Sequence, residues 1–298
     1  MPRVVIISTY DLGRQPFGLA SPAAWLRRAG AEVRCLDLAV EPFDEAAVRD
    51  ADLIALFLPM HTATRLAAKA LERVRALNPR AHLCGYGLYA PMNEAFLRGR
   101  GVHTVLGGEY ESGLVKWVET LPPRSRQPLP SISLERQEFL VPDRSRLPAL
   151  SAYARLVDEQ GTARVVGYTE ASRGCKHLCR HCPVVPVYQG RFRIVQRDVV
   201  LADIRQQVAV GAEHITFGDP DFFNGIGHAI PIVKALHQEF PDLTYDVTIK
   251  IEHLLKHAAH LATLRETGCL FVTSAVESID DQVLRDRKST RLNSSHRL

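Results

Sequence analysis

Three cysteines in one short segment are the residues of this chain with the clearest chemical potential. Cys175, Cys179 and Cys182 have the spacing C-x3-C-x2-C and follow a run that is typical of a strand. Three thiolates on one loop can converge on one face of a metal centre, and the cations of Lys176 and Arg180 lower the cost of gathering negative charge there. Such a centre keeps one coordination position open.

The kind of metal follows from what surrounds the cysteines. A structural zinc site normally closes with a fourth Cys or His, and its cysteines usually come in two separated pairs, which this chain lacks. A zinc site that recruits His177 or His181 stays open as an alternative, as do three unrelated structural thiols. The expected place of the loop, at the carboxyl end of a β/α strand, favours an iron-sulfur centre, because such folds keep their chemistry at that end.

Strand-like and helical patterns alternate in the second half of the chain. The pattern predicts strands at 164–168, 214–217, 243–251 and 269–274, with helices at 197–210, 228–240 and 253–266. Repeats of this kind predict a partial (β/α) barrel of about four units over residues 164–285, since a closed barrel needs more strands.

The first half shows a similar alternation of continuous apolar runs and helical patterns. Strands are expected at 3–8, 32–38, 53–58, 82–86 and 104–106, and helices at 20–29, 63–77, 92–100 and 112–121. Buried parallel strands joined by helices predict an α/β fold, here a doubly wound, Rossmann-like domain over residues 1–121. Its ligand crevice is expected at the carboxyl ends of the strands.

Two segments fall outside these patterns. Residues 122–163 are rich in Pro and Arg and predict a linker that packs without regular structure. Residues 286–298 have no apolar period, predict an unstructured tail, and resemble an artefact of sequencing or cloning. We therefore expect a truncated frame, in which the fourth barrel strand offers an unpaired apolar edge.

Composition narrows the class of protein. The chain has 298 residues, 46% hydrophobic and 23% charged, which excludes disorder, collagen and coiled coil. No apolar run is long enough to span a bilayer, and the N-terminus lacks an export signal, so a soluble, cytoplasmic protein is expected. The formal net charge of +4 comes mostly from residues 286–298, so it does not indicate a nucleic-acid partner.

The cysteine motif and its setting resemble those of the radical S-adenosylmethionine (radical SAM) enzymes. The resemblance implies that Cys175, Cys179 and Cys182 hold a 4Fe–4S cluster whose fourth iron binds S-adenosylmethionine. It further implies an external electron donor of the flavodoxin or ferredoxin type and reductive cleavage to a 5'-deoxyadenosyl radical. His181 stands where the family usually has an aromatic residue near the adenine, so it is expected to bind the cofactor in an altered way.

The same resemblance assigns further cofactor-binding residues at strand ends. Gly218 and Asp219 follow the second barrel strand, where many members have Gly-Gly-Glu to meet the methionine amino group; Asp221 is a second candidate anion, and a plain strand-end turn is the alternative. Lys250 shares the end of the third strand with Glu252.

The period of two places Lys250 and Glu252 on one face, where they contact the cofactor or only each other. Ser274 and Glu277 resemble the fourth-strand stretch that contacts the ribose and the methionine carboxylate.

A doubly wound domain before such a barrel resembles the cobalamin-binding class of this family. The usual Asp-x-His-x-x-Gly signature is absent, because the loop 10–18 contains no histidine. Either cobalamin binds without a protein ligand to its lower face, or the domain keeps only the fold. No G-x-G-x-x-G follows the first strand, which argues against a nicotinamide site. His61 and the run 107–109 also lie at expected strand ends and are weak candidates for ligand contacts.

The functional hypothesis is therefore a radical SAM enzyme of unassigned substrate. Two alternatives stay open: a cobalamin-dependent radical SAM methyltransferase, and a non-catalytic zinc or iron-sulfur binding module. Segments at 15–20 and 182–188 look most like a group named for a Cys- or selenocysteine-containing Ala-Glu-Pro tail (CUAEP/CCAEP), although that tail is absent.

The remaining cysteines and histidines have structural explanations. Cys35, Cys84 and Cys269 lie in apolar runs and are expected in the core. The histidines at 253, 257 and 260 have helical spacing, which suits a metal site, but no carboxylate accompanies them in a motif, so a solvated helix face is expected.

Overall fold

The computed structural model describes residues 1–120, 131–276 and 278–287, without the side chains of 281, 285 and 287. The chain divides into two compact units, Met1–Tyr153 and Ala154–Leu298. No helix among the described residues has the length and apolar character needed to cross a membrane.

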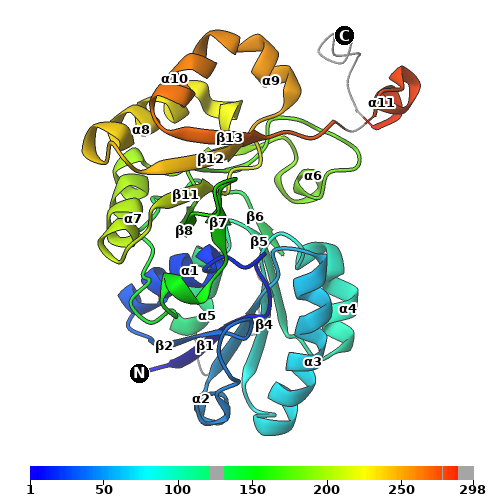
Figure 1. Cartoon of the computed structure of the whole chain (residues 1–298). Coiled ribbons are helices and arrows are strands. Elements are labelled where there is room, and N and C mark those ends of the chain that lie inside the picture. Colours follow the sequence, from blue (N-terminus) through cyan, green and yellow to red (C-terminus); the bar gives the residue numbers. More distant parts are fainter. Residues whose placement is uncertain (121–130, 277, 288–298) are drawn as a thin grey trace. The chain divides into compact units, whose positions relative to one another are not determined.

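The first unit is built on a six-stranded parallel sheet of order β2-β1-β3-β4-β5-β6 (Figure 1). Its strands are β1 (Arg3–Ser8), β2 (Glu32–Asp37), β3 (Leu53–Phe57), β4 (His82–Tyr86), β5 (Thr104–Gly108) and β6 (Ile132–Ser133). The order reverses between β1 and β3, and in open α/β sheets this switch point is where ligands bind.

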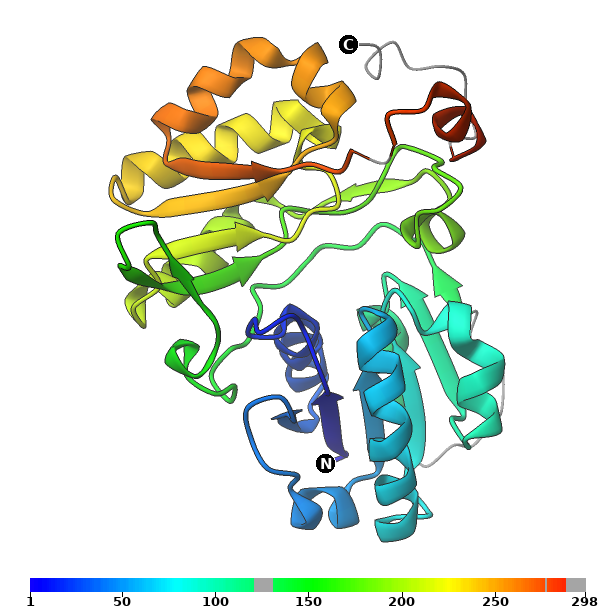
Figure 2. The same ribbon diagram turned by 45° about the vertical axis from the view of Figure 1, so that its right-hand side comes forward.

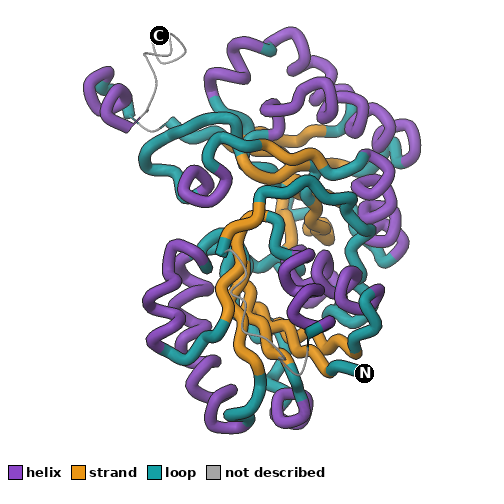
Figure 3. Tube along the Cα trace, turned by 180° about the vertical axis from the view of Figure 1, so that it is seen from behind, coloured by secondary structure: helices purple, strands orange, loops and turns teal. Residues whose placement is uncertain are grey.

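Helices cover both faces of this sheet (Figure 3). They are α1 (Phe17–Arg28), α2 (Glu45–Asp50), α3 (His61–Leu77), the short η1 (Pro91–Asn93) with α4 (Glu94–Gly99), and α5 (Glu111–Glu119). Alternate residues of β1 serve the two faces, since Val4 and Ile6 pack with α1 and α5, whereas Val5 and Ile7 pack with α2, α3 and α4. The doubly wound fold predicted from the sequence is confirmed.

The segment 122–163 is more regular than its composition suggested. Its described part pairs β6 with β5, and a Cβ at Gly108 would lie 2.1 Å from the Ser133 carbonyl oxygen, so only glycine allows this approach. Gln15 Nε2 donates to the Pro148 carbonyl at 2.8 Å, which ties the segment to the first unit. Pairing with an existing sheet edge gives this segment regular structure that its Pro-rich composition did not predict.

The second unit contains a five-stranded sheet of order β13-β12-β11-β8-β7 (Figure 2). Strands β8 (Ala163–Thr169), β11 (His214–Phe217), β12 (Thr244–Thr248) and β13 (Cys269–Thr273) run parallel, and β7 (Arg155–Val157) pairs antiparallel to β8. The connecting helices are α7 (Arg197–Ala209), η3 (Phe222–Gly225) with α8 (Ile226–Glu239), and α9 (Ile251–Lys256), η4 (Ala258–His260) and α10 (Leu261–Glu266). The half-barrel fold is thus confirmed.

Three details of the second unit differ from the sequence prediction. Strand β12 ends at Thr248 and α9 begins at Ile251, so Lys250 and Glu252 do not share a strand face. The expected helix 253–266 is broken into α9, η4 and α10. Helix α11 (Asp281–Arg287) includes the first two residues of the expected unstructured tail, whereas 288–298 lie outside the described residues.

Strand β13 forms one edge of the second sheet, as expected for the fourth barrel strand. Two of its large apolar side chains are exposed, Leu270 to 48% and Phe271 to 44%. An apolar edge of this kind is a template for pairing with a further strand.

A histidine in the first unit makes stability depend on pH. His82 stacks on Trp117 at 4.1 Å and its Nε2 lies 2.9 Å from the Thr104 hydroxyl; burial, followed by the neighbouring His103, lowers the pKa of His82 to about 4. The folded ring stays neutral while the unfolded ring takes up a proton below about 6.5. The free energy of unfolding should therefore fall as the pH drops from 6.5 to 4, by roughly 1–3 kcal/mol after allowance for partial exposure.

Urea unfolding followed by tryptophan fluorescence tests this expectation, because both tryptophans, Trp25 and Trp117, lie in the first unit. In His82→Gln, which keeps a hydrogen-bonding side chain, the difference in unfolding free energy between pH 7 and pH 4 should shrink by that amount. An equal pH dependence in the variant and the parent would show that another group is responsible.

Candidate functional site

A short antiparallel ribbon carries the cysteine loop. Strand β9 (Ser172–Gly174) comes directly after β8 and pairs with β10 (Phe192–Ile194), so the loop between them begins at Cys175 and returns to the same ribbon. Within it, the Cys182 amide donates to the Cys179 carbonyl at 3.1 Å, and α6 (Val184–Tyr188) follows. Strands of three residues are too short to show a pattern in sequence, which is why this ribbon was not predicted.

Gly174 fixes the direction in which the chain enters the loop. Its φ of +71° lies in the left-handed region, and a Cβ there would lie 2.3 Å from the Arg191 carbonyl oxygen and 2.5 Å from Tyr188. Gly174→Ala should therefore destabilise the loop by about 1–3 kcal/mol.

The expected result for Gly174→Ala is a lower iron content after anaerobic reconstitution, measured beside Gly161→Ala. Gly161 also has a positive φ, but a Cβ there would meet no atom within 4 Å, so this variant isolates the steric contribution. Equal iron content in the two variants would show that crowding at Gly174 does not shape the loop.

The three thiols are partly buried, and none of them is in a disulfide. Asn224 Nδ2 donates to Cys175 Sγ at 3.3 Å, and Lys176 Nζ holds Asn224 in place by donating to its carbonyl at 2.6 Å. Burial raises the pKa of the Cys175 thiol, and the Asn224 hydrogen bond opposes that effect. A positive metal centre is therefore what would keep this sulfur as a thiolate.

The spacing of the sulfurs separates two kinds of metal centre. Within the described residues, the three thiols do not form a group whose ligand atoms all lie within 4.8 Å of one another. A single tetrahedral zinc needs its sulfurs closer, since each lies about 2.3 Å from the ion. A cluster that binds each thiolate at a different iron holds the three sulfurs farther apart than a single zinc ion does.

Gly218 and Asp219 lie at the end of β11, against the start of the cysteine ribbon. Asp219 is 3% exposed, and its carboxylate accepts from the Ala171 amide at 3.0 Å and from the Ser172 hydroxyl. A Cβ at Gly218 would lie 1.8 Å from the Tyr168 hydroxyl oxygen. Both residues therefore contact the protein itself and fix the corner between β8 and β9.

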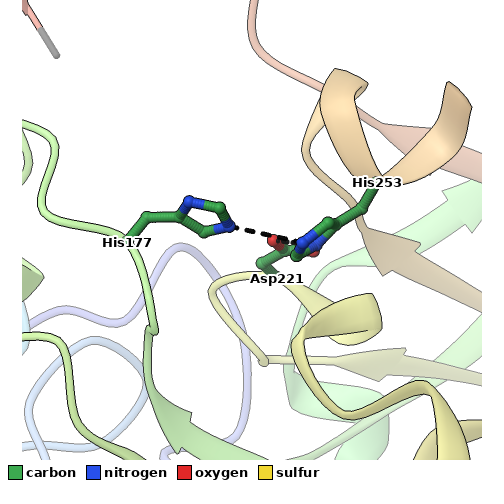
Figure 4. A group of neighbouring side chains, drawn as sticks. All are labelled: His177, Asp221 and His253. Atoms are coloured by element: carbon green, nitrogen blue, oxygen red, sulfur yellow. Dashed lines mark hydrogen bonds and ion pairs between the residues drawn. The ribbon is translucent and has the colours of Figure 1, made fainter. Parts of the chain in front are cut away.

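A second polar group lies beside the loop and was not predicted (Figure 4). His253 is buried, 9% exposed, and its Nε2 lies 3.3 Å from His177 Nε2 while its Nδ1 lies 2.7 Å from Asp221 Oδ2. The expectation of a solvated face at His253 was wrong, because α9 turns this residue toward the end of β11.

Lys250 joins the same group from the start of α9. Its Nζ lies 3.0 Å from His177 Nδ1 and 2.9 Å from Glu252 Oε2, so Lys250 and Glu252 do pair with each other, and Lys250 also contacts the cysteine loop. Burial, followed by the charge of Lys250, lowers the pKa of His177, which keeps its ring neutral near pH 7.

The remaining sequence-predicted residues are dispersed around the loop. His181 is exposed in the turn between Cys179 and Cys182. Ser274 follows β13, and its hydroxyl oxygen is shielded from solvent without a hydrogen-bond partner. Glu277 lies outside the described residues.

The carboxyl edge of the first sheet contains no histidine in the loop after β1. His61 is exposed as the first residue of α3 and does not cap that helix, since Met60 occupies the cap position without a side-chain bond. Gly107 and Gly108 pack against the chain around β6. The usual cobalamin signature has its histidine in the loop after β1. In this chain that loop supplies no imidazole.

The other three cysteines were all expected in the core, and the structure places two of them there. Cys35 and Cys84 are fully buried, and burial raises the pKa of Cys35 to about 12. Cys269 is only partly buried; burial raises the pKa of its thiol to about 11, so it stays protonated near pH 7.

Comparisons with known proteins show which proteins have a similar sequence and fold. No protein-family model matches the chain. The hopanoid C-3 methylase of Methylococcus capsulatus is 24% identical over 305 residues, which cover 95% of this chain and 57% of the methylase. A structure of the radical S-adenosylmethionine methyltransferase TsrM from Kitasatospora setae, with cobalamin and a 4Fe–4S cluster bound, matches with a TM-score of 0.71 at 17% identity.

A second TsrM structure, with tryptophan substrate and the SAM analogue aza-SAM bound, matches with a TM-score of 0.70 at 17% identity. Both matches cover 95% of this chain, and 62% and 60% of the TsrM chains. The chain thus spans less than two thirds of the length of these relatives.

The architecture predicted from the resemblance is confirmed. The chain has the fold of a radical SAM protein in which a cobalamin-binding-like domain precedes a half barrel. The truncated frame and the group named for the Ala-Glu-Pro tail stay predictions.

Proposed function

We propose that the chain is the cobalamin and radical SAM portion of a methyltransferase. The observation that carries the proposal is the C-x3-C-x2-C loop on the β9–β10 ribbon, preceded by a doubly wound domain, in a chain whose fold is similar to that of TsrM over 95% of its length. The match to a methylase covers 95% of the chain. It favours methyl transfer over the more general hypothesis of a radical SAM enzyme of unassigned substrate.

The cysteines would hold a 4Fe–4S cluster. In such proteins the cluster supplies the electron that cleaves S-adenosylmethionine, and cobalamin carries the methyl group. Cys175, Cys179 and Cys182 would bind it through their sulfurs, and Asn224 orients Cys175 by its hydrogen bond. Asp219 keeps the ribbon at the strand ends.

Residues at the strand ends would bind S-adenosylmethionine. His181 is exposed on the cysteine loop, and the shielded Ser274 hydroxyl lacks a partner that a nucleoside hydroxyl would provide. Glu277 and Lys250 complete the proposed set, together with the backbone beside Gly218. Asp219 contributes by fixing the end of β11, because its carboxylate already accepts two hydrogen bonds.

The first unit would hold cobalamin at the switch point between β1 and β3. The loop after β1 lacks a histidine, so the proposal includes binding without a lower-face ligand from that loop. An external flavodoxin or ferredoxin would supply the electron in the cytoplasm. The proposal does not assign a methyl acceptor. Hopanoid is named for the Methylococcus relative, and tryptophan is the substrate bound in a TsrM structure.

Anaerobic reconstitution with iron and sulfide tests the proposal. The expected results are a brown protein, 5'-deoxyadenosine or S-adenosylhomocysteine after addition of reductant and S-adenosylmethionine, and retention of added hydroxocobalamin on gel filtration. Colourless protein with tightly held zinc would favour the non-catalytic binding module. A loaded cluster with no retained cobalamin would return the assignment to the general radical SAM interpretation.

A further inference from the structure

His177, Asp221 and His253 form a convergent set of metal-ligating side chains outside the three cysteines. They come from three separate elements: the cysteine loop, the segment between β11 and η3, and helix α9. One ligand atom of each lies within 4.8 Å of the other two (Figure 4). Only the tertiary fold brings side chains from three separate elements together. This distinguishes the group from histidines that are neighbours only because they share one helix.

Two atoms of this set are buried without a hydrogen bond. Asp221 is 2% exposed, and its Oδ2 faces His253 Nδ1 at 2.7 Å, yet the alignment of the two does not make a hydrogen bond and neither atom has another partner. An unsatisfied buried polar atom costs about 1–3 kcal/mol, and more when it is charged. A bound cation between these side chains would satisfy the buried carboxylate oxygen.

We propose that His177, Asp221 and His253 bind one divalent transition-metal ion, separate from the metal centre of the cysteines. The two imidazole Nε2 atoms lie 3.3 Å apart. Two nitrogens each about 2.0–2.1 Å from a tetrahedral zinc ion lie about 3.3–3.4 Å apart, so this separation suits two ligands of one ion. Two imidazoles and one carboxylate match Zn²⁺ or Fe²⁺ and leave a coordination position open.

Lys250 and Glu252 adapt the group to an ion. When a metal occupies His177 Nε2, the neutral ring carries its proton on Nδ1, where Lys250 Nζ now lies at 3.0 Å. The ammonium then loses its acceptor on the ring and keeps Glu252, already 2.9 Å away. The Lys250 ammonium therefore stays paired with the Glu252 carboxylate, and Lys250 can keep its position and its charge when the ion binds.

The proposal does not depend on the proposed function, because none of the three ligands is a cysteine. The metal-free alternative for the same residues is a chain of polar contacts, with hydrogen bonds from Lys250 through His177 to His253 and an ion pair between His253 and Asp221. The two differ in what happens when the carboxylate becomes an amide: an ion loses a ligand, whereas the imidazole keeps a neutral polar group beside it.

Titration of the cluster-loaded protein with Co²⁺ tests the site, with visible absorption and elemental analysis as readouts. We expect about one Co²⁺ per chain beyond the iron, and a difference spectrum between the titrated and untreated protein that lacks the charge-transfer bands of Co²⁺–thiolate bonds. His253→Gln should lose this binding, and Asp221→Asn should weaken it about tenfold or more. Competition with Zn²⁺ should remove the Co²⁺ spectrum.

His260→Gln is the matched control, since His260 lies a few residues farther along, outside the set, at the start of α10. It should bind Co²⁺ as the parent does, and all variants should keep the iron and sulfide content of the parent, which separates loss of this site from failure of the cluster. Unchanged Co²⁺ affinity in both His253→Gln and Asp221→Asn would overturn the proposal. So would Co²⁺–thiolate charge-transfer bands in the difference spectrum of the cluster-loaded parent.

Discussion

Replacing any one of Cys175, Cys179 or Cys182 with alanine should abolish cluster loading, the largest effect expected for this chain. Each thiolate would bind a different iron, so the loss of one leaves an iron without its protein ligand. The sulfurs do not all lie within 4.8 Å of one another, so a neighbouring cysteine does not sit where it can take over the vacated position.

Iron and sulfide analysis with the absorbance of the reconstituted proteins measures this effect. Cys269→Ala is the matched control, because Cys269 lies on β13 outside the loop and is only partly buried. It should retain the iron content of the parent. Loading that survives in the loop variants and fails in Cys269→Ala would refute the assignment of the three cysteines.

The fold was predictable wherever a pattern repeats over several residues. The limits expected for β1 and β4 agree with the structure, because their apolar runs are bounded by polar residues and turns. Strands β9 and β10 were missed because three residues show no period, and β6 was missed because its two residues stand among prolines. Such elements exist through pairing with a partner distant in sequence.

The residues of the candidate site show the same contrast between local motifs and contacts that form only in the fold. The cysteines and the turn that begins at Gly218 could be proposed from the sequence because each is a local motif. The group of His177, Asp221 and His253 was not found, since its members are separated by 44 and 32 positions and meet only through the parallel order of β8, β11 and β12. The helical spacing of His253 with 257 and 260 gave a misleading signal, because α9 and α10 are separate helices.

Asp219→Ala should remove the hydrogen bonds that hold the start of the cysteine ribbon against the end of β11. The Asp219 carboxylate accepts hydrogen bonds from Ser172 and Ala171, on the chain entering β9, while its own backbone follows β11. The alanine leaves a buried amide and a buried hydroxyl without acceptors, which costs about 2–4 kcal/mol in total. Because β9 leads directly into Cys175, the cysteine loop should lose its fixed starting point.

Amide hydrogen exchange over residues 163–175 should therefore accelerate by about 30-fold or more in Asp219→Ala, as the lost free energy implies. The iron content after reconstitution should fall in parallel. Asp242→Ala, in the exposed turn before β12, serves as the control and should change neither. Faster exchange with full iron content would mean that the cluster itself organises the loop and that the corner is dispensable. Unchanged exchange would mean that the other contacts of this segment, among them the pairing of β9 with β10, are enough to fix the entry to the first cysteine.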